Sequence, residues 1–245
     1  MRRPVLLVVA HGSRDPRHAA TVHELVGRVR SLRPGLRVET GFLDFNIPSV
    51  QGVLESLDAE GVRDVVALPL LLTRAFHAKS DIPAVLTQAP PRLRIHQAEV
   101  LGPSPLLLSA LERRLYEAGL TPADKSSTGV VLASAGSSDP EAIAVIAAIA
   151  REWRHTGWCA VRPAFASASL PRTEQAVREL RALGCARVAV APYVLAPGFL
   201  PDRIARGAAG ADVLAGVLGP APEVARVLLE RYDEARAPLL AAVGA

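Results

Sequence analysis

An internal repeat constrains the fold of this chain more than any other feature of its sequence. The segment Val5–Pro16 reads VLLVVAHGSRDP, and Val130–Pro140 reads VVLASAGSSDP. In register, four residues of the turn match: Gly12 with Gly136, Ser13 with Ser137, Asp15 with Asp139, and Pro16 with Pro140. A sequence that repeats at this scale repeats a structural unit. We therefore predict two half-size modules, 1–120 and 129–245, joined by a polar linker at 121–128.

Two histidines occur in the first copy only. His11 aligns with Ala135, and His77 aligns with Leu200. The requirements of folding act on both copies alike, so a residue that only one copy holds points to chemistry rather than to the fold. The two imidazoles are therefore the first candidates for a functional site.

Apolar runs alternate with amphipathic stretches in both halves. Val5–Ala10 is an unbroken aliphatic run, which is typical of a parallel strand covered on both faces. Strands are expected at 5–10, 36–42, 64–71, 93–100, 130–133, 159–165, 187–192 and 212–217, and helices at 18–32, 49–60, 82–88, 103–118, 141–153, 173–183, 202–207 and 222–237. This alternation predicts the α/β class, with two tandem αβα modules and mainly parallel sheets.

The predicted strands bring both histidines to one edge of a sheet. Open parallel sheets bind ligands beyond the carboxyl ends of their strands. His11 directly follows the first strand, and His77 lies a few residues past the third. Neutral imidazoles bind borderline divalent metals such as Fe²⁺, Co²⁺ or Ni²⁺, and they accept protons near neutral pH. Two such ligands without cysteine make an open site, which suits a metal that is passed on rather than a structural metal.

Other polar side chains surround the two histidines. Asp44 follows the second strand and aligns with Ser167, so a carboxylate is lost from the second copy as well. It could be a third ligand or a proton acceptor, or it could cap the turn toward Pro48, and both interpretations stay open. Further candidates for binding the carboxylates of a substrate are Ser13, Arg14, Arg74 and Lys79. The remaining histidines share no helix face or metal spacing and are weaker candidates: His18, His23, His96 and His155.

Composition excludes several classes of function. The net charge of +4 is too small and too dispersed to indicate nucleic-acid binding. Cys159 and Cys185 have no metal spacing and lie in apolar stretches, so we expect both in the core. No segment reaches membrane-spanning length and no nucleotide motif is present. We expect a cytoplasmic protein without an organic cofactor that binds neither nucleic acid nor membrane.

Three segments resemble the sirohydrochlorin chelatases of the CbiX and SirB type. They are VVAHGSRDP, FLDFNIPS and LPLLLTRAFHAKSDIP, of which the last is the most specific. The resemblance covers most of residues 1–118 and, more faintly, the second half, so the chain resembles the long, two-module form. It implies an αβα sandwich for each half, with a tetrapyrrole in the cleft between the halves.

The resemblance also implies an activity and the residues that perform it. The activity is insertion of Fe²⁺ or Co²⁺ into sirohydrochlorin, on the way to sirohaem or cobalamin, with Ni²⁺ as a further possible metal substrate. His11 and His77 would handle the metal, and Asp44 stands where the family usually has glutamate. Residues 129–245 would form a structural half without ligands of their own. We expect a monomer with internal pseudo-two-fold symmetry.

Two other functions compete with metal insertion. A non-catalytic carrier of metal or tetrapyrrole would use the same histidines without turnover. A phosphohistidine phosphatase also has His-Gly after its first strand, but such enzymes carry arginine directly before that histidine. Ala10 stands there in this chain, which disfavours phosphoryl transfer.

Overall fold

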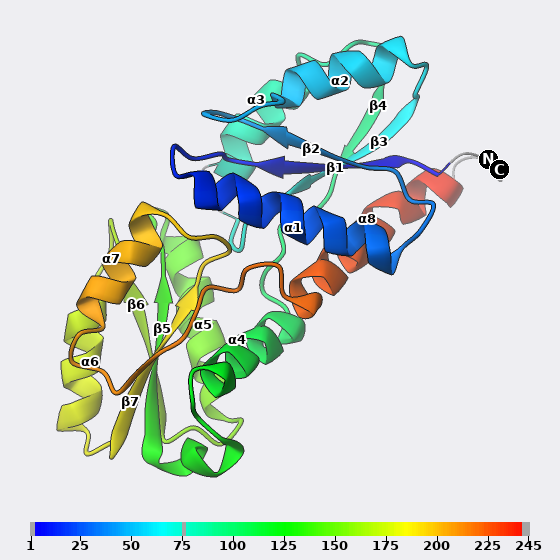
Figure 1. Cartoon of the computed structure of the whole chain (residues 1–245). Coiled ribbons are helices and arrows are strands. Elements are labelled where there is room, and N and C mark those ends of the chain that lie inside the picture. The colour runs from blue at the N-terminus through cyan, green and yellow to red at the C-terminus, as the bar shows by residue number, and fades with distance from the viewer. Residues whose placement is uncertain (1–2, 75–76, 242–245) are drawn as a thin grey trace. The chain divides into compact units, whose positions relative to one another are not determined.

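The computed structural model of the chain describes residues 3–74 and 77–241, without the side chains of His77 and of residues 239–241. The chain forms two compact units (Figure 1). The first comprises Met1–Gly102 and Pro220–Ala245, and the second comprises Pro103–Gly219.

The first unit is built on a four-stranded parallel sheet in the order β2-β1-β3-β4. Its strands are β1 (Val5–Ala10), β2 (Val38–Phe42), β3 (Asp64–Pro69) and β4 (Arg94–Gln97). Every residue of β1 is buried, because this central strand is covered by helices on both faces. The unbroken apolar run in the sequence therefore marks the middle of the sheet.

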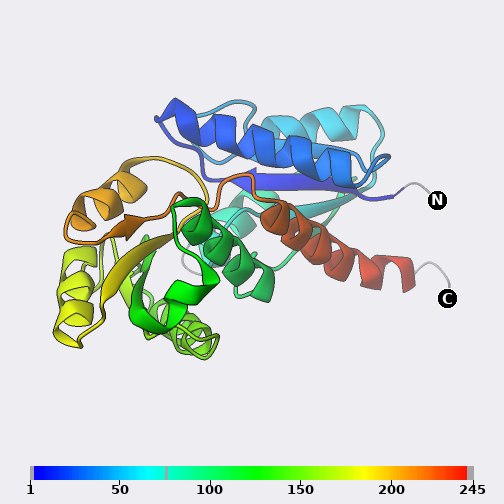
Figure 2. The same ribbon diagram turned by 60° about the horizontal axis from the view of Figure 1, so that its bottom comes forward.

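Helices cover both faces of this sheet. One face carries α1 (Pro16–Leu32) and α8 (Pro222–Ala241), and the other carries α2 (Val50–Ala59) and α3 (Ile82–Leu86), which follows a short π-helix, η1 (His77–Asp81) (Figure 1). Helix α1 buries apolar residues at helical spacing: Val22, Leu25, Val26 and Val29. Figure 2 shows α8, from the end of the chain, beside the sheet of the first unit, where it packs on β3 and β4. Tyr232 of α8 donates a hydrogen bond to the Pro4 carbonyl at 2.7 Å.

The second unit repeats this plan with a parallel sheet in the order β6-β5-β7-β8. Its strands are β5 (Thr128–Ser134), β6 (Ala160–Phe165), β7 (Arg187–Tyr193) and β8 (Val213–Leu214). Its helices are α4 (Pro105–Glu117), α5 (Pro140–Arg154), α6 (Thr173–Ala182) and α7 (Phe199–Gly207). The predicted α/β class with two parallel-sheet modules is confirmed.

The last helix of each repeat packs in the unit built by the other repeat. Helix α4 ends the first repeat, yet it packs on β7, and Arg114 donates from Nη2 to the Leu218 carbonyl at 2.9 Å. Helix α8 ends the second repeat, yet it packs on α1 and β3, where Asp233 pairs with Arg33 at 2.7 Å. The repeat boundaries at 1–120 and 129–245 describe the duplicated sequence and do not coincide with the compact units.

Further details differ from the sequence expectations, among them the eighth strand, which was expected over 212–217 and spans Val213–Leu214. The polar linker is ordered as a 3₁₀-helix, η2 (Pro122–Ser127), which leads directly into β5. Cys185 is buried, but Cys159 is exposed, so the prediction of a core position for Cys159 is wrong. The two thiols are unbridged and their Sγ atoms lie 3.6 Å apart. In the described part of the chain, no helix has the length and apolarity that a membrane crossing needs.

Candidate functional site

A tight turn after β1 holds His11 at the carboxyl edge of the first sheet. Gly12 has a φ of 93°, and a Cβ atom there would stand 1.9 Å from the Asp44 carbonyl oxygen. Only glycine fits so close an approach of two backbones in this conformation. The Asp44 N–H in turn donates to the His11 carbonyl at 2.9 Å. The turn after β1 and the turn after β2 therefore stabilise each other through this hydrogen bond and close backbone packing.

The second unit has the same turn without the same side chains. Gly136 has a φ of 91°, and a Cβ atom there would stand 2.0 Å from the Ser167 carbonyl oxygen. The Ser167 N–H donates to the Ala135 carbonyl at 2.9 Å. The backbone of the turn is thus made without a histidine, so the His11 imidazole is not needed to form it.

The contacts of the His11 ring assign its two nitrogens. His11 is half-buried, and its Nδ1 lies 3.2 Å from the Gly12 carbonyl oxygen. Since a carbonyl oxygen only accepts, Nδ1 is the donor in this pair, and in the neutral ring Nε2 then carries the lone pair. Nε2 is therefore the nitrogen of His11 that can bind a metal or accept a proton.

His18, which the sequence placed among the weaker candidates, lies close to His11 in the structure. It lies in the first turn of α1, and its Nδ1 is shielded from solvent with no hydrogen-bond partner among the described residues. Burial lowers the pKa of His18, and the nearby charge of His11 lowers it further. From the matched prolines Pro16 and Pro140, His18 aligns with Ala142. The same comparison of copies that selected His11 would have selected His18.

Asp44 takes part in the turn through one carboxylate oxygen. Its side chain is exposed, and Oδ1 accepts a hydrogen bond from the Phe45 N–H at 2.8 Å. This contact favours the turn-capping interpretation. A role for Asp44 as a ligand or proton acceptor stays a prediction.

Ser13 and its counterpart Ser137 make the same hydrogen bond within their turns. Its N–H donates to Asn46 Oδ1 at 2.8 Å, and its Oγ accepts from the Asp15 N–H at 3.1 Å. In the second copy, Ser137 Oγ accepts from the Asp139 N–H at 3.0 Å. Ser13 therefore has a structural role that is independent of any ligand, and its role in substrate binding stays a prediction.

Arg14 lies against an aromatic ring next to His11. Its guanidinium carbon is 5.2 Å from the centroid of the Phe45 ring, and the His11 ring centroid is 6.4 Å from the same point. Phe45 was not among the residues selected from the sequence. The structure thus brings His11, His18, Arg14, Asp44 and Phe45 together at the carboxyl edge of β1 and β2, and we call these five residues the β1–β2 cluster.

Arg74 and Lys79 form a separate group beside β4. They line a pocket of about 290 Å³ together with Gln97 and Glu99. The guanidinium of Arg74 lies 3.7 Å from the Glu99 carboxylate, and both side chains are exposed.

The segment that carries His77 is tied to β1 at its start. The Leu70 N–H donates to the Val9 carbonyl at 2.8 Å, so the chain leaves β3 beside the end of β1. His77 opens η1, and its side chain lies outside the described residues. The pairing of His11 with His77 stays a prediction. Among the side chains that the structure describes, no three of His, Cys, Asp or Glu lie close enough together to hold a metal ion.

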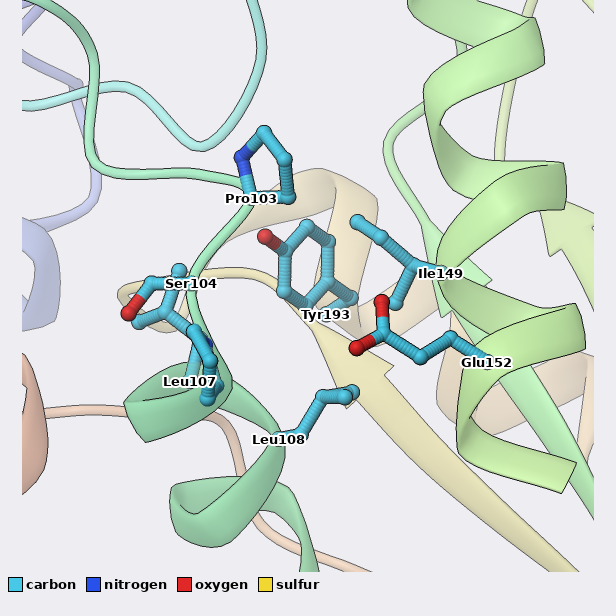
Figure 3. Close-up of a pocket in the computed structure, with 8 residues that line it drawn as sticks. Pro103, Ser104, Leu107, Leu108, Ile149, Glu152 and Tyr193 are labelled. Atoms are coloured by element: carbon cyan, nitrogen blue, oxygen red, sulfur yellow. The ribbon is translucent and has the colours of Figure 1, made fainter. Parts of the chain in front are cut away.

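The second unit has a pocket of a different kind (Figure 3). It holds about 170 Å³ between α4, α5 and β7, and its walls are mainly apolar. Glu152 and Tyr193 are the charged and phenolic groups that line it. None of the site residues selected from the sequence lies there.

Comparison with known proteins places the chain in a family. The family model CbiX matches residues 5–118 and again residues 129–235. The chain belongs to the CbiX family. The double match agrees with the internal repeat, since each half of this CbiX chain corresponds to one copy.

Relatives of this CbiX chain are named as chelatases. The sirohydrochlorin cobaltochelatase of Priestia megaterium is 31% identical, over 94% of this chain and 79% of its own length. The sirohydrochlorin ferrochelatase of Bacillus subtilis (strain 168) is 27% identical, over 96% of this chain and 93% of its own length. The solved structure of SirB from Bacillus subtilis with Fe³⁺ superimposes with a TM-score of 0.82 at 25% identity, covering 98% of both chains.

Proposed function

We propose that this chain is a chelatase that inserts Fe²⁺ or Co²⁺ into sirohydrochlorin, for the synthesis of sirohaem or of cobalamin. One observation carries the proposal. The turn after the first strand is built alike in both units, yet only the unit with His11 has an imidazole there. The family supplies the class of substrate, because relatives over most of this chain are named for sirohydrochlorin and for cobalt or iron.

The chemistry requires groups that bind a metal and groups that take up protons. A divalent ion enters the macrocycle as two pyrrole N–H protons leave, so the charge balances. Nε2 of His11 can hold the incoming ion or take one proton, and His77 is the proposed partner for the other task. Asp44 is a further proton acceptor or ligand at the same edge. The metal is a substrate, and Ni²⁺ is a third candidate for it.

The acidic substrate needs cationic groups around the metal-handling residues. Sirohydrochlorin is a polycarboxylate, and guanidinium and ammonium groups bind carboxylates by charge-assisted hydrogen bonds. We assign this task to Arg14 in the β1–β2 cluster and to Arg74 and Lys79 beside β4, with Ser13 as a neutral donor. We further propose that the chain works as a monomer in the cytoplasm, without an organic cofactor and without nucleic-acid or membrane partners.

Substitution of His77 tests this function. His77→Ala should lower the rate of Co²⁺ or Fe²⁺ insertion at least about 100-fold, because one of the two metal-handling groups is lost. Insertion is followed by the absorbance change of metal-free sirohydrochlorin, corrected for the spontaneous reaction. His155→Ala is the matched control, since His155 caps the end of α5 in the second unit. Full turnover by folded His77→Ala protein would refute the assignment.

The same assay separates an enzyme from a carrier. A chelatase converts many equivalents of sirohydrochlorin for each protein chain. A carrier shows one equivalent of change at most, and its rate in excess substrate equals the spontaneous rate. Excess substrate with a trace of protein therefore decides between the two functions.

A further inference from the structure

No requirement of the fold explains the aromatic side chain of Phe45 in the β1–β2 cluster. The side chain is 50% exposed, although an aromatic ring of this size gains free energy when it is buried. Its backbone has a φ of 61°, in the left-handed region that bulky side chains disfavour. A large apolar residue that is exposed at such a position indicates a functional constraint.

The second unit shows that the turn itself does not need an aromatic ring. Ala168 stands at the matching position with a φ of 58°. The surrounding hydrogen bonds are also alike, since the Asn46 N–H donates to the Asp44 carbonyl at 2.7 Å and the Ser169 N–H donates to the Ser167 carbonyl at 2.6 Å. The ring of Phe45 is therefore an addition to a backbone that forms equally well with a methyl group.

The neighbours of Phe45 indicate what its ring meets. Arg14 lies over it, with the guanidinium carbon 5.2 Å from the centroid, and the His11 ring lies 6.4 Å away at an interplanar angle of 35°. An exposed aromatic face beside a cation and an imidazole matches a flat, conjugated molecule with carboxylates on its rim and a metal-binding centre. A contact between two copies of the chain would not call for the imidazole.

We propose that Phe45 is a binding residue for the macrocycle: the exposed face of its ring stacks on one face of sirohydrochlorin, while Arg14 pairs with a carboxylate on the rim. This inference rests on the proposed function and adds the surface that holds the substrate. Phe45 takes no part in proton or metal transfer. It places the centre of the macrocycle over His11, so its loss weakens substrate binding more than it slows insertion.

Binding of metal-free sirohydrochlorin to the whole chain, without metal, tests the proposal. Phe45→Ala should raise the dissociation constant about tenfold, which is the size of one aromatic stacking contact, and should raise KM with little change in kcat. Phe45→Tyr should restore the affinity. Co²⁺ binding by the protein alone should be the same in all variants. The folding of Phe45→Ala is expected to be intact, because Ala168 holds the same conformation.

Leu32→Ala is the matched control. Leu32 is 47% exposed and ends α1, at the opposite edge of the sheet from the β1–β2 cluster. An unchanged affinity in Phe45→Ala, or an equal loss in Leu32→Ala, overturns the proposal. A change in oligomeric state with unchanged affinity assigns the ring to a contact between copies and also overturns it. If wild-type protein inserts no metal, the proposed function fails. If wild-type protein inserts metal and Phe45→Ala binds sirohydrochlorin equally well, only the role of Phe45 fails.

Discussion

The carboxyl edges of the two sheets share a backbone and differ in their side chains. In the first unit, the edge presents His11, His18, Asp44 and Phe45; in the second, it presents Ala135, Ala142, Ser167 and Ala168 at the matching positions. The positive φ angles of the turn differ by only a few degrees, 93° against 91° and 61° against 58°. Each of these four candidates in the first unit is thus matched by a small residue in the second.

This difference separates what the fold requires from what chemistry requires. Gly12 and Gly136 are retained because two backbones approach too closely for any side chain. The imidazoles, the carboxylate and the aromatic ring are absent from one copy at no cost to the turn. The two copies of the duplicated chain therefore allow the effect of each side chain on the turn to be compared directly.

The largest expected effect comes from removing the imidazole of the β1 turn. His11→Ala should lower the rate of metal insertion at least about 100-fold, with an unchanged free energy of unfolding, since Ala135 occupies the same turn. Activity is measured by sirohydrochlorin absorbance and stability by urea unfolding. Adding Ala135→His to this variant should restore nothing. Recovery of metal insertion by Ala135→His would show that the carboxyl edges of the two sheets are functionally equivalent, and would contradict the assignment of the site to the first unit.

Substitution of the two turn glycines should instead affect both units alike. Gly12→Ala and Gly136→Ala each place a Cβ atom about 2 Å from a carbonyl oxygen at a positive φ. Each should lower the free energy of unfolding by about 2–4 kcal/mol, measured by urea denaturation. Gly35→Ala is the control, because Gly35 has a φ of 84° but open space at its Cβ position, so it should cost less. A loss confined to Gly12→Ala would show that the two turns are built differently.

His18→Ala should change how stability depends on pH. Because burial lowers the pKa of folded His18 below its ordinary value of 6.5, the unfolded chain binds a proton near that pH before the folded chain does. Wild-type stability should therefore fall as pH decreases from about 7 to about 5, and His18→Ala should lack this contribution. Urea midpoints across that range measure it. Thr21→Ala, on the same helix, should follow the wild-type slope. A steeper loss in His18→Ala would contradict the lowered pKa.

The smallest expected effect is on the free energy of unfolding, when the hydroxyl is removed from a buried tyrosine in each unit. The hydroxyl of Tyr232 donates to the Pro4 carbonyl at 2.7 Å, whereas that of Tyr193 has no partner among the described residues. Tyr232→Phe should cost about 1 kcal/mol of unfolding free energy. Tyr193→Phe should cost nothing or stabilise, because a buried polar group without a partner carries a desolvation penalty. Equal losses would show that the Tyr193 hydroxyl finds a partner in solution, such as water in the pocket of Figure 3.

Much of the fold follows from local sequence pattern. Unbroken apolar runs such as Val5–Ala10 predicted parallel strands, because a strand covered on both faces has no polar side. The repeat predicted two modules of the same plan, and the position of His11 after the first strand predicted its place at the carboxyl edge. Each of these features depends on neighbours in the chain or on a single rule of topology.

Other features depend on contacts between distant segments. Helices α4 and α8 each pack on the sheet formed by the other repeat. The repeat could not predict this packing, because an apolar helix face does not specify which of two sheets it covers. The exposure of Cys159 could not be predicted, because the sequence of an apolar stretch does not show which of its side chains point to solvent.

The sequence by itself determined the architecture and selected His11, because spacing and periodicity carry that information along the chain. Only the tertiary structure brought His18 and the Phe45 ring beside His11. Their approach depends on how the first turn of α1 and the turn after β2 pack against the end of β1. No local pattern records that packing.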